Sequence, residues 1–202
     1  MLLLNYSNLI DPFLRDIRSF IPGFAGMTPQ NTVLDVCCGT GEQVMEYGMN
    51  GIDAVGIDND PDMLKVAFTN RIKRQLTNVS FQLADATHLP FPNDYFDYSS
   101  ISFGLHDKVK VIRDSVIHEM KRVVKQSGIF IFIDFRVPLP MNMWGFAAKT
   151  VEFFVGGDHY RGFKNYVSGG GLSEILKEHH IRELQKTQRT RGLIEVIKAV
   201  ND

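Results

Sequence analysis

Short apolar runs and helical apolar stripes alternate along most of this chain. Five runs rich in β-branched or aromatic residues are too short for helices and predict buried strands. These runs are 32–36, 53–58, 78–84, 95–103 and 129–134. Apolar residues at three- and four-residue spacing predict helices over 43–50, 61–72 and 109–123, the last ended by Gln126-Ser127-Gly128. Asn59-Asp60-Pro61 predicts a cap at the start of the second of these helices. The alternation predicts an α/β fold with a doubly wound, mostly parallel sheet.

The N-terminal part of the chain predicts a helix beside this sheet, and the C-terminal part predicts two further strands. A helical stripe runs from Tyr6 to Phe24, with Pro22-Gly23 as the expected stop, so residues 1–30 are expected to form an N-terminal helical cap. Its apolar positions are Leu9, Ile10, Phe13, Leu14, Ile17, Phe20 and Ile21. The runs 183–190 and 193–200 surround Arg191-Gly192 and predict a closing antiparallel strand pair. The chain is most simply one domain, 1–202, with a seven-stranded sheet.

The turn after the first strand carries the clearest ligand signal. Gly39 and Gly41 let the backbone approach a ligand closely, and the amides that open the following helix would point at it. Asp58 ends the second predicted strand, where a parallel nucleotide-binding unit places the carboxylate that accepts hydrogen bonds from ribose hydroxyls. We therefore expect a ligand over the carboxyl ends of the strands.

Composition excludes several classes of function. The formal net charge of −1 provides no excess of positive charge for binding nucleic acid, so we expect no nucleic-acid partner. Met1 to Leu4 is apolar but far shorter than a membrane span, so we expect a cytoplasmic protein without an integral membrane segment. The two cysteines, Cys37 and Cys38, are adjacent and suit neither a disulfide framework nor a zinc site, and no metal is expected. The sequence leaves the oligomeric state open.

An ordered set of motifs resembles the class I S-adenosylmethionine (SAM)-dependent methyltransferases. The set consists of Val33 to Gly41, Gly56-Ile57-Asp58, Ala84-Asp85-Ala86 with Leu89-Pro90-Phe91, and Phe96-Asp97. Ile101 to Leu105, Glu119 to Val123 and the strand after Gly128 more narrowly resemble the ubiquinone/menaquinone-biosynthesis C-methyltransferases (methyltransferase type 11). The resemblance covers about residues 30 to 137. It implies a Rossmann-like fold, SAM as cofactor and methyl transfer to a small, hydrophobic or aromatic acceptor.

The resemblance also implies a role for individual positions. Asp35 would order the turn and the methionine end of SAM, Asp58 would bind the ribose diol, and Asp85 the adenine amino group. The backbone amide of Ala86 would contact the adenine ring, and Phe103 would lie beside the methionine part of SAM. The complete implied cofactor-binding set is Asp35, Cys37, Gly39, Gly41, Asp58, Asn59, Asp85, Ala86 and Phe103.

The acceptor side departs from that branch. His106 and Asp107 stand where the branch has arginine and asparagine. His106 is the candidate catalytic base, because it follows the fourth strand and an imidazole titrates near neutrality. Other candidates for the base are His159, Tyr160 and His88. The alternative for His106 is that it is an ordinary surface histidine on a loop.

Residues 138–180 are expected to form a substrate-side insertion. The mostly apolar stretch Met141 to Val155 fits either a helix packed on the sheet or a lid over a hydrophobic acceptor. Gly156 to Tyr160 is expected to be mobile, and Leu172, Ile175 and Leu176 mark a short helix.

Two alternative functions share some of these features. A nicotinamide-dependent oxidoreductase would also need a glycine turn and an acid after the second strand, but Cys38 to Glu42 lacks its fuller glycine fingerprint. A SAM-binding protein without catalysis stays open, because the cofactor motifs are clearer than any acceptor site.

Overall fold

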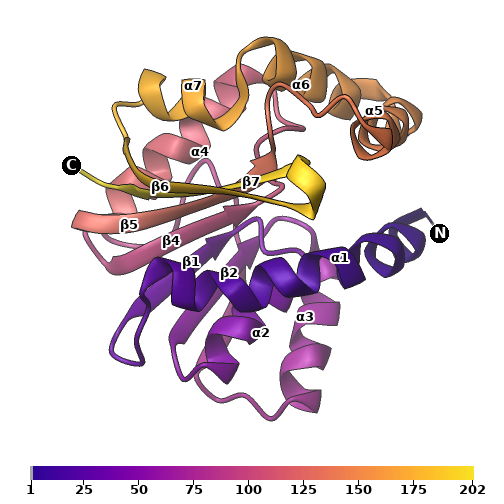
Figure 1. Cartoon of the computed structure of the whole chain (residues 1–202). Coiled ribbons are helices and arrows are strands. Elements are labelled where there is room, and N and C mark those ends of the chain that lie inside the picture. The colour runs from indigo at the N-terminus through magenta and orange to yellow at the C-terminus, as the bar shows by residue number, and fades with distance from the viewer. Residues whose placement is uncertain (1) are drawn as a thin grey trace.

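The computed structural model describes residues 2–202, and it describes side chains from Leu14 onward. Within this range seven strands form one sheet in the order β3-β2-β1-β4-β5-β7-β6 (Figure 1). The first five strands run parallel, and β7 is antiparallel to β5 and β6. The predicted α/β fold with a closing antiparallel pair is confirmed. The strands are β1 (Thr32–Val36), β2 (Asp53–Asp58), β3 (Val79–Leu83), β4 (Phe96–Ser102), β5 (Val124–Phe135), β6 (Arg182–Arg189) and β7 (Ile194–Val200).

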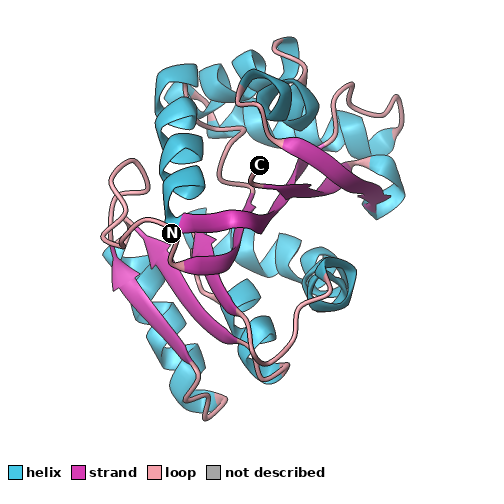
Figure 2. Ribbon diagram, turned by 90° about the vertical axis from the view of Figure 1, so that its left-hand side faces the viewer, coloured by secondary structure: helices cyan, strands magenta, loops and turns pink. Residues whose placement is uncertain are grey.

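Helices cover both faces of the sheet, as the two views in Figures 1 and 2 show. In Figure 1, α2 and α3 lie below the sheet, whereas α4, α6 and α7 lie above it. The helices are α1 (Leu2–Ala25), α2 (Glu42–Met49), α3 (Pro61–Lys73), α4 (Lys110–Val123), α5 (Met143–Val155), α6 (Gly157–Ser168) and α7 (Gly171–Glu178), and a 3-10 turn, η1 (Thr190–Gly192), joins β6 to β7. The chain proceeds outward from β1 to β3 and then returns to β4 beside β1. Ligands of such sheets bind at this reversal, outside the carboxyl ends of the strands.

Strands β1 and β5, on the two sides of the middle strand β4, are buried because helices cover both faces of the sheet. Val33, Leu34 and Val36 of β1 are fully buried, and so are Phe130 and Phe132 of β5. This explains their nearly continuous apolar sequence, which is typical of parallel strands covered on both sides. The predicted cap of α3 is also present. Asp60 accepts hydrogen bonds from the amides of Asp62 and Met63, and Pro61 is the first helical residue.

The first helix continues past its expected stop at Pro22-Gly23. It ends at Ala25, and Gly26 has the left-handed conformation (φ 74°) that commonly follows a helix. The amide of Met27 donates to the carbonyl of Pro22, so the last turn is closed two residues beyond the prediction. Ile17 and Ile21 pack in the core. Leu9, Ile10 and Phe13 lie outside the residues whose side chains are described.

The helix stop expected at Gln126-Ser127-Gly128 is instead part of β5. Helix α4 ends at Val123 and the strand starts at Val124, with a register shift against β4 and a positive φ at Ser127. Asn201 explains why no separate loop is needed. Its side-chain amide donates to the carbonyls of Lys121 and Val124, and its backbone exchanges hydrogen bonds with Ser127 and Gly128. The C-terminus therefore holds this irregular strand start in place.

The segment Gly156 to Tyr160, expected to be mobile, begins a helix. Gly156 has φ 70° and ψ −165°, and this conformation separates α5 from α6. Gly162 then lets α6 approach the loop after β4, because a Cβ at this position would collide with the carbonyl group of Asp107. The two glycines mark a sharp turn between helices, and packing against a distant loop positions the second helix. The mobility of this segment stays a prediction.

Candidate active site

A cavity of about 370 Å³ opens at the reversal in strand order. The carboxyl ends of β1, β4 and β5 form its floor, with the glycine turn after β1 beside them. Ile17 of α1 and Trp144 and Val151 of α5 contribute walls, and Ile194 of β7 closes another part. Its lining is mostly apolar, so segments far apart in the sequence enclose a site suited to a ligand with apolar parts.

The turn after β1 is built around Asp58. The amide of Gly39 donates to Asp58 Oδ2 at 2.7 Å, and the amide of Asp60 donates to Asp58 Oδ1 at 3.0 Å. Gly39 has φ 53° and lines the cavity. Because each carboxylate oxygen can accept more than one hydrogen bond, Asp58 keeps acceptor capacity for a ligand.

Gly41 is required for packing rather than for the cavity wall. Its φ is 77°, and a Cβ there would lie 2.6 Å from ring atoms of Phe81 and 3.0 Å from Ala67. A side chain at this position would force β3 and α3 away from the turn. The glycine therefore fixes how closely the turn packs on its neighbours.

Asp35 is a buried carboxyl group at the cavity floor. Burial raises its pKa to about 7, and the hydrogen bond that Ser100 Oγ donates to it at 2.6 Å acts in the opposite direction. Only 2% of Asp35 is exposed, so its charge is poorly solvated. A cationic ligand in the cavity would favour the ionised form.

The two cysteines are free thiols in the cavity wall. Burial raises the pKa of Cys37 to about 12 and also raises the pKa of Cys38 well above its ordinary value. Both are therefore neutral near neutral pH and poor nucleophiles. Cys37 has φ 57°, so the first turn position accepts a side chain although its conformation favours glycine.

The cavity brings together part of the predicted cofactor set. Asp35, Cys37, Gly39 and Phe103 line it. The remaining predicted positions lie outside its lining: Gly41, Asp58, Asn59, Asp85 and Ala86. All but Gly41 end or follow β2, which lies next to β1 in the sheet, or β3, which lies beyond β2.

The adenine-side residues differ in exposure. Asp85 and Asn59 are exposed, whereas Ala86 is buried. Asp85 accepts a hydrogen bond from the amide of Thr87 at 2.8 Å, which is the main reason that its pKa lies below the ordinary value. Their roles in cofactor binding stay predictions.

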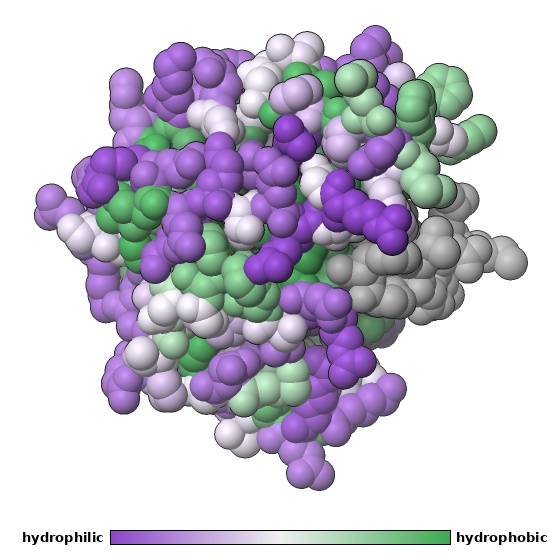
Figure 3. Space-filling model, viewed as in Figure 1, coloured by the Kyte–Doolittle hydropathy of each residue, from purple (hydrophilic) through white to green (hydrophobic). Residues whose placement is uncertain are grey.

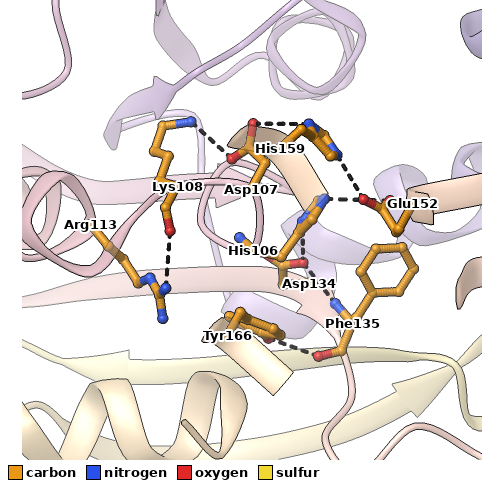
Figure 4. A network of polar contacts seen from close by, with 9 residues as sticks. All are labelled: His106, Asp107, Lys108, Arg113, Asp134, Phe135, Glu152, His159 and Tyr166. Atoms are coloured by element: carbon orange, nitrogen blue, oxygen red, sulfur yellow. Dashed lines mark hydrogen bonds and ion pairs between the residues drawn. The ribbon is translucent and has the colours of Figure 1, made fainter. Parts of the chain in front are cut away.

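His106 is buried in a polar cluster behind the cavity (Figure 4). Its Nδ1 donates a hydrogen bond to Asp134 Oδ1 at 2.7 Å, and its Nε2 lies 3.8 Å from Glu152 Oε1. Glu152 Oε2 accepts a hydrogen bond from His159 Nε2 at 2.7 Å. Burial lowers the pKa of His106, but the Asp134 carboxylate outweighs this effect and holds the pKa above its ordinary value.

The sequence missed the acids of this cluster. His106 lies in the loop after β4, as expected, yet it is buried and does not line the cavity, whereas Glu152 does. Two signals were visible: Asp134 near the carboxyl end of the most apolar strand, and Glu152 as a lone acid in an apolar helix. His159 joins the cluster, whereas His88 is exposed and contacts Thr87.

The sequence profile of methyltransferase domains matches residues 28–186. The chain belongs to this family. The resemblance to class I enzymes is confirmed: the chain is a SAM-dependent methyltransferase domain, and its cofactor is SAM. No helix among the described residues is both long and apolar enough to cross a membrane.

Curated relatives include enzymes named for quinone biosynthesis. The chain is 38% identical over 115 residues to a demethylmenaquinone methyltransferase of Paenarthrobacter aurescens, a match that covers 55% of this chain and 43% of the relative. It is 28% identical over 191 residues to a ubiquinone/menaquinone biosynthesis C-methyltransferase of Burkholderia mallei, covering 91% of this chain and 75% of the relative. The chain thus spans under half the length of the first relative.

Solved structures share the fold at low identity. A SAM-dependent methyltransferase from Aquifex aeolicus has a TM-score of 0.70 and 19% identity, covering 92% of this chain and 89% of that one. Geranyl diphosphate C-methyltransferase from Streptomyces coelicolor, solved with Mg²⁺, geranyl diphosphate and S-adenosyl-L-homocysteine, has a TM-score of 0.68 and 14% identity, covering 93% and 80%. At these identities the likeness concerns the fold alone.

Proposed function

We propose that this chain transfers the methyl group of SAM to a small, largely apolar acceptor, such as the carbon or oxygen of a phenol or quinol. The cavity carries this proposal, because it joins the glycine turn to the apolar wall formed by α5. The names of the curated relatives, which concern quinones, support the same acceptor class.

Asp35, Cys37, Gly39 and Phe103 would hold the methionine end of SAM in the cavity. Asp58, Asn59, Asp85 and Ala86 would extend the site along the ends of β2 and β3 toward the adenosine part, beside Gly41. The methyl group of the sulfonium is already activated, so the protein mainly aligns the acceptor and excludes water.

Residues 138–180 would form the acceptor side of the site. One side of α5 contributes Trp144, Ala148 and Val151 to the cavity. Another side is exposed, and Figure 3 shows apolar side chains at the upper right, where Figure 1 places α5. Phe146 and Phe154 of this helix are 68% and 78% exposed. A helix that is apolar on both sides is suited to border a hydrophobic acceptor.

His106 would assist proton removal from an acceptor hydroxyl through Glu152, which meets the cavity. We expect Glu152→Gln to lower the rate of methyl transfer by about 10²-fold or more, the usual range of general-base assistance, with SAM affinity nearly unchanged. His106→Asn should lower the rate comparably. Single-turnover assays with saturating SAM measure this effect, and a full rate in both folded variants would remove the pair from the reaction.

Isotope-labelled SAM tests the proposed acceptor class. The protein would be incubated with quinols, phenols, amines and a cell lysate, and labelled products sorted by solubility in organic solvent. Label in an organic-soluble product supports the proposal, whereas label only in protein or nucleic acid overturns it. SAM binding without turnover on any substrate would instead favour the non-catalytic alternative.

A further inference from the structure

The buried ring of His106 has one nitrogen without a hydrogen-bond partner among the described residues. Its Nδ1 donates to Asp134, so in the neutral ring Nε2 carries a lone pair. Nε2 is buried and faces Glu152 Oε1 at 3.8 Å, which is too long for a hydrogen bond. A buried polar atom without a partner is costly, so the Nε2 lone pair is placed to bind a hydrogen-bond donor or a cation.

Three side chains converge at this nitrogen (Figure 4). His106, Glu152 and His159 each offer one ligand atom, and these atoms lie within 4.8 Å of one another. They come from the loop after β4, from α5 and from α6. Ligand atoms around a tetrahedral zinc ion are about 3.3 Å apart, given metal–ligand distances of about 2.0–2.2 Å. Small side-chain movements would therefore bring all three within range of one ion.

An aspartate also lies near Nδ1 of each histidine. Asp134 Oδ1 accepts the hydrogen bond from His106 Nδ1, and Asp107 Oδ2 lies 3.8 Å from His159 Nδ1. Metal-binding histidines typically donate their other ring N–H to a carboxylate, which fixes the ring and raises its basicity. Nε2 of both rings is directed toward Glu152. An ion can bind His159 Nε2 only when the ring proton moves to Nδ1, on the side of Asp107, and the hydrogen bond from Nε2 to Glu152 is given up.

We propose that His106, Glu152 and His159 bind a divalent transition-metal ion of the Zn²⁺ type, with Asp134 and Asp107 as positioning residues. Two imidazoles and a carboxylate suit Zn²⁺ or Co²⁺ better than Mg²⁺ or Ca²⁺, which prefer oxygen ligands. The His159 side chain is 31% exposed and offers a path from solvent. The site differs from the expectation of no metal, which rested on the two cysteines and on the activated methyl group of SAM.

The proposed ion would lie at the edge of the acceptor cavity, because Glu152 belongs to both the cluster and the cavity wall. There it could bind an acceptor oxygen and act on it as a Lewis acid. The metal site itself does not depend on the identity of the acceptor.

Metal titration of chelator-treated protein tests the proposal without measuring activity. Zn²⁺ is added in competition with a chromophoric chelator, and Co²⁺ binding is followed by visible absorption. We expect about one ion per chain, with affinity at least about 100-fold lower in Glu152→Gln and His159→Ala, and about 10–100-fold lower in Asp134→Asn. His179→Ala is the matched control, because His179 pairs with one carboxylate, Asp114, at 3.0 Å and should leave the affinity unchanged.

No binding by the wild type, or equal affinity in folded Glu152→Gln and His159→Ala, would overturn the metal site. Because the His159 side chain is 31% exposed and Glu152 is buried, His159→Ala should disturb the fold less than Glu152→Gln. SAM binding is measured by calorimetry on the same metal-free samples. Retained SAM binding with no Zn²⁺ binding refutes the metal site alone, whereas loss of SAM binding in folded wild-type protein refutes the cofactor assignment.

Discussion

Single residues in the site illustrate how burial gives ordinary side chains unusual chemistry. Asp35 is nearly inaccessible and holds a proton at a pH where an exposed carboxyl would be charged. In His106, Nδ1 has a hydrogen-bond partner, whereas the buried Nε2 has none among the described residues. Both residues are therefore prepared for a charged ligand: a cationic group beside Asp35, and the proposed metal ion at His106.

The raised pKa of Asp35 predicts a pH-dependent stability. The folded protein holds this proton more tightly than the unfolded chain, so the contribution of Asp35 is fully present below pH 3.8 and is lost as the pH rises toward about 7. The loss amounts to at most about 4 kcal/mol. Asp35→Asn should flatten this dependence, as measured by urea unfolding between these pH values, whereas Asp53→Asn, at an exposed position, should not. Parallel profiles for wild type and Asp35→Asn would contradict the prediction.

Asp58 should contribute directly to cofactor affinity. Asp58→Asn keeps one acceptor oxygen for the glycine turn but removes the charge, and we expect SAM binding to weaken by about 1.5–3 kcal/mol. Calorimetry measures the change. Asp60→Ala is the control, because it removes the cap of α3 and should cost about 0.5–2 kcal/mol of stability with little effect on SAM affinity. An unchanged dissociation constant in folded Asp58→Asn would exclude Asp58 from the site.

At the scale of elements, α5 connects the cavity to the polar cluster. Its Trp144 and Val151 line the cavity, its Glu152 faces both histidines, and Gly156 turns the chain into α6, which supplies His159. A shift of α5 would change the acceptor wall and the cluster together. This coupling makes the segment the natural place for closure over a substrate.

The segment Met141 to Tyr160 should become less mobile when ligands bind. Hydrogen exchange with and without S-adenosyl-L-homocysteine should show slower exchange in α5 and in the start of α6. Helix α7 contributes nothing to the cavity lining and serves as the internal control. If protection rises around the glycine turn but stays equal throughout Met141 to Tyr160, the segment is a fixed wall rather than a lid.

At the scale of the whole molecule, the site draws on nearly every layer of the fold. Residues of α1, the β1 turn, α5 and β7 enclose one cavity, so the ligand should connect parts that unfold together. A ligand that binds only the folded state stabilises it by mass action.

S-adenosyl-L-homocysteine should therefore raise the melting temperature of the whole chain. At about 100 times its dissociation constant it adds about 2.7 kcal/mol, which corresponds to a shift of about 5–10 °C for a protein of this size. NADH at the same concentration should give no shift. A shift with NADH instead would support the oxidoreductase alternative, and differential scanning fluorimetry distinguishes the two results.

The sequence by itself determined the strands, most helices and the glycine turn. Strands 53–58 and 129–134, the cap at Asp60 and the closing pair around Arg191-Gly192 follow from hydrophobic periodicity and turn chemistry, which act between near neighbours. Asp58 could be placed for the same reason, since it ends a strand directly after a recognisable turn.

The tertiary structure alone decided the polar cluster and the irregular start of β5. His106 meets Asp134, Glu152 and His159 only after three separate segments have packed, and Asn201 orders residues 124–128 from the far end of the chain. Local patterns carry no information on such contacts, because they depend on how helices lie against the sheet. The sequence therefore located the cofactor turn, whereas folding created the buried histidine site beside it.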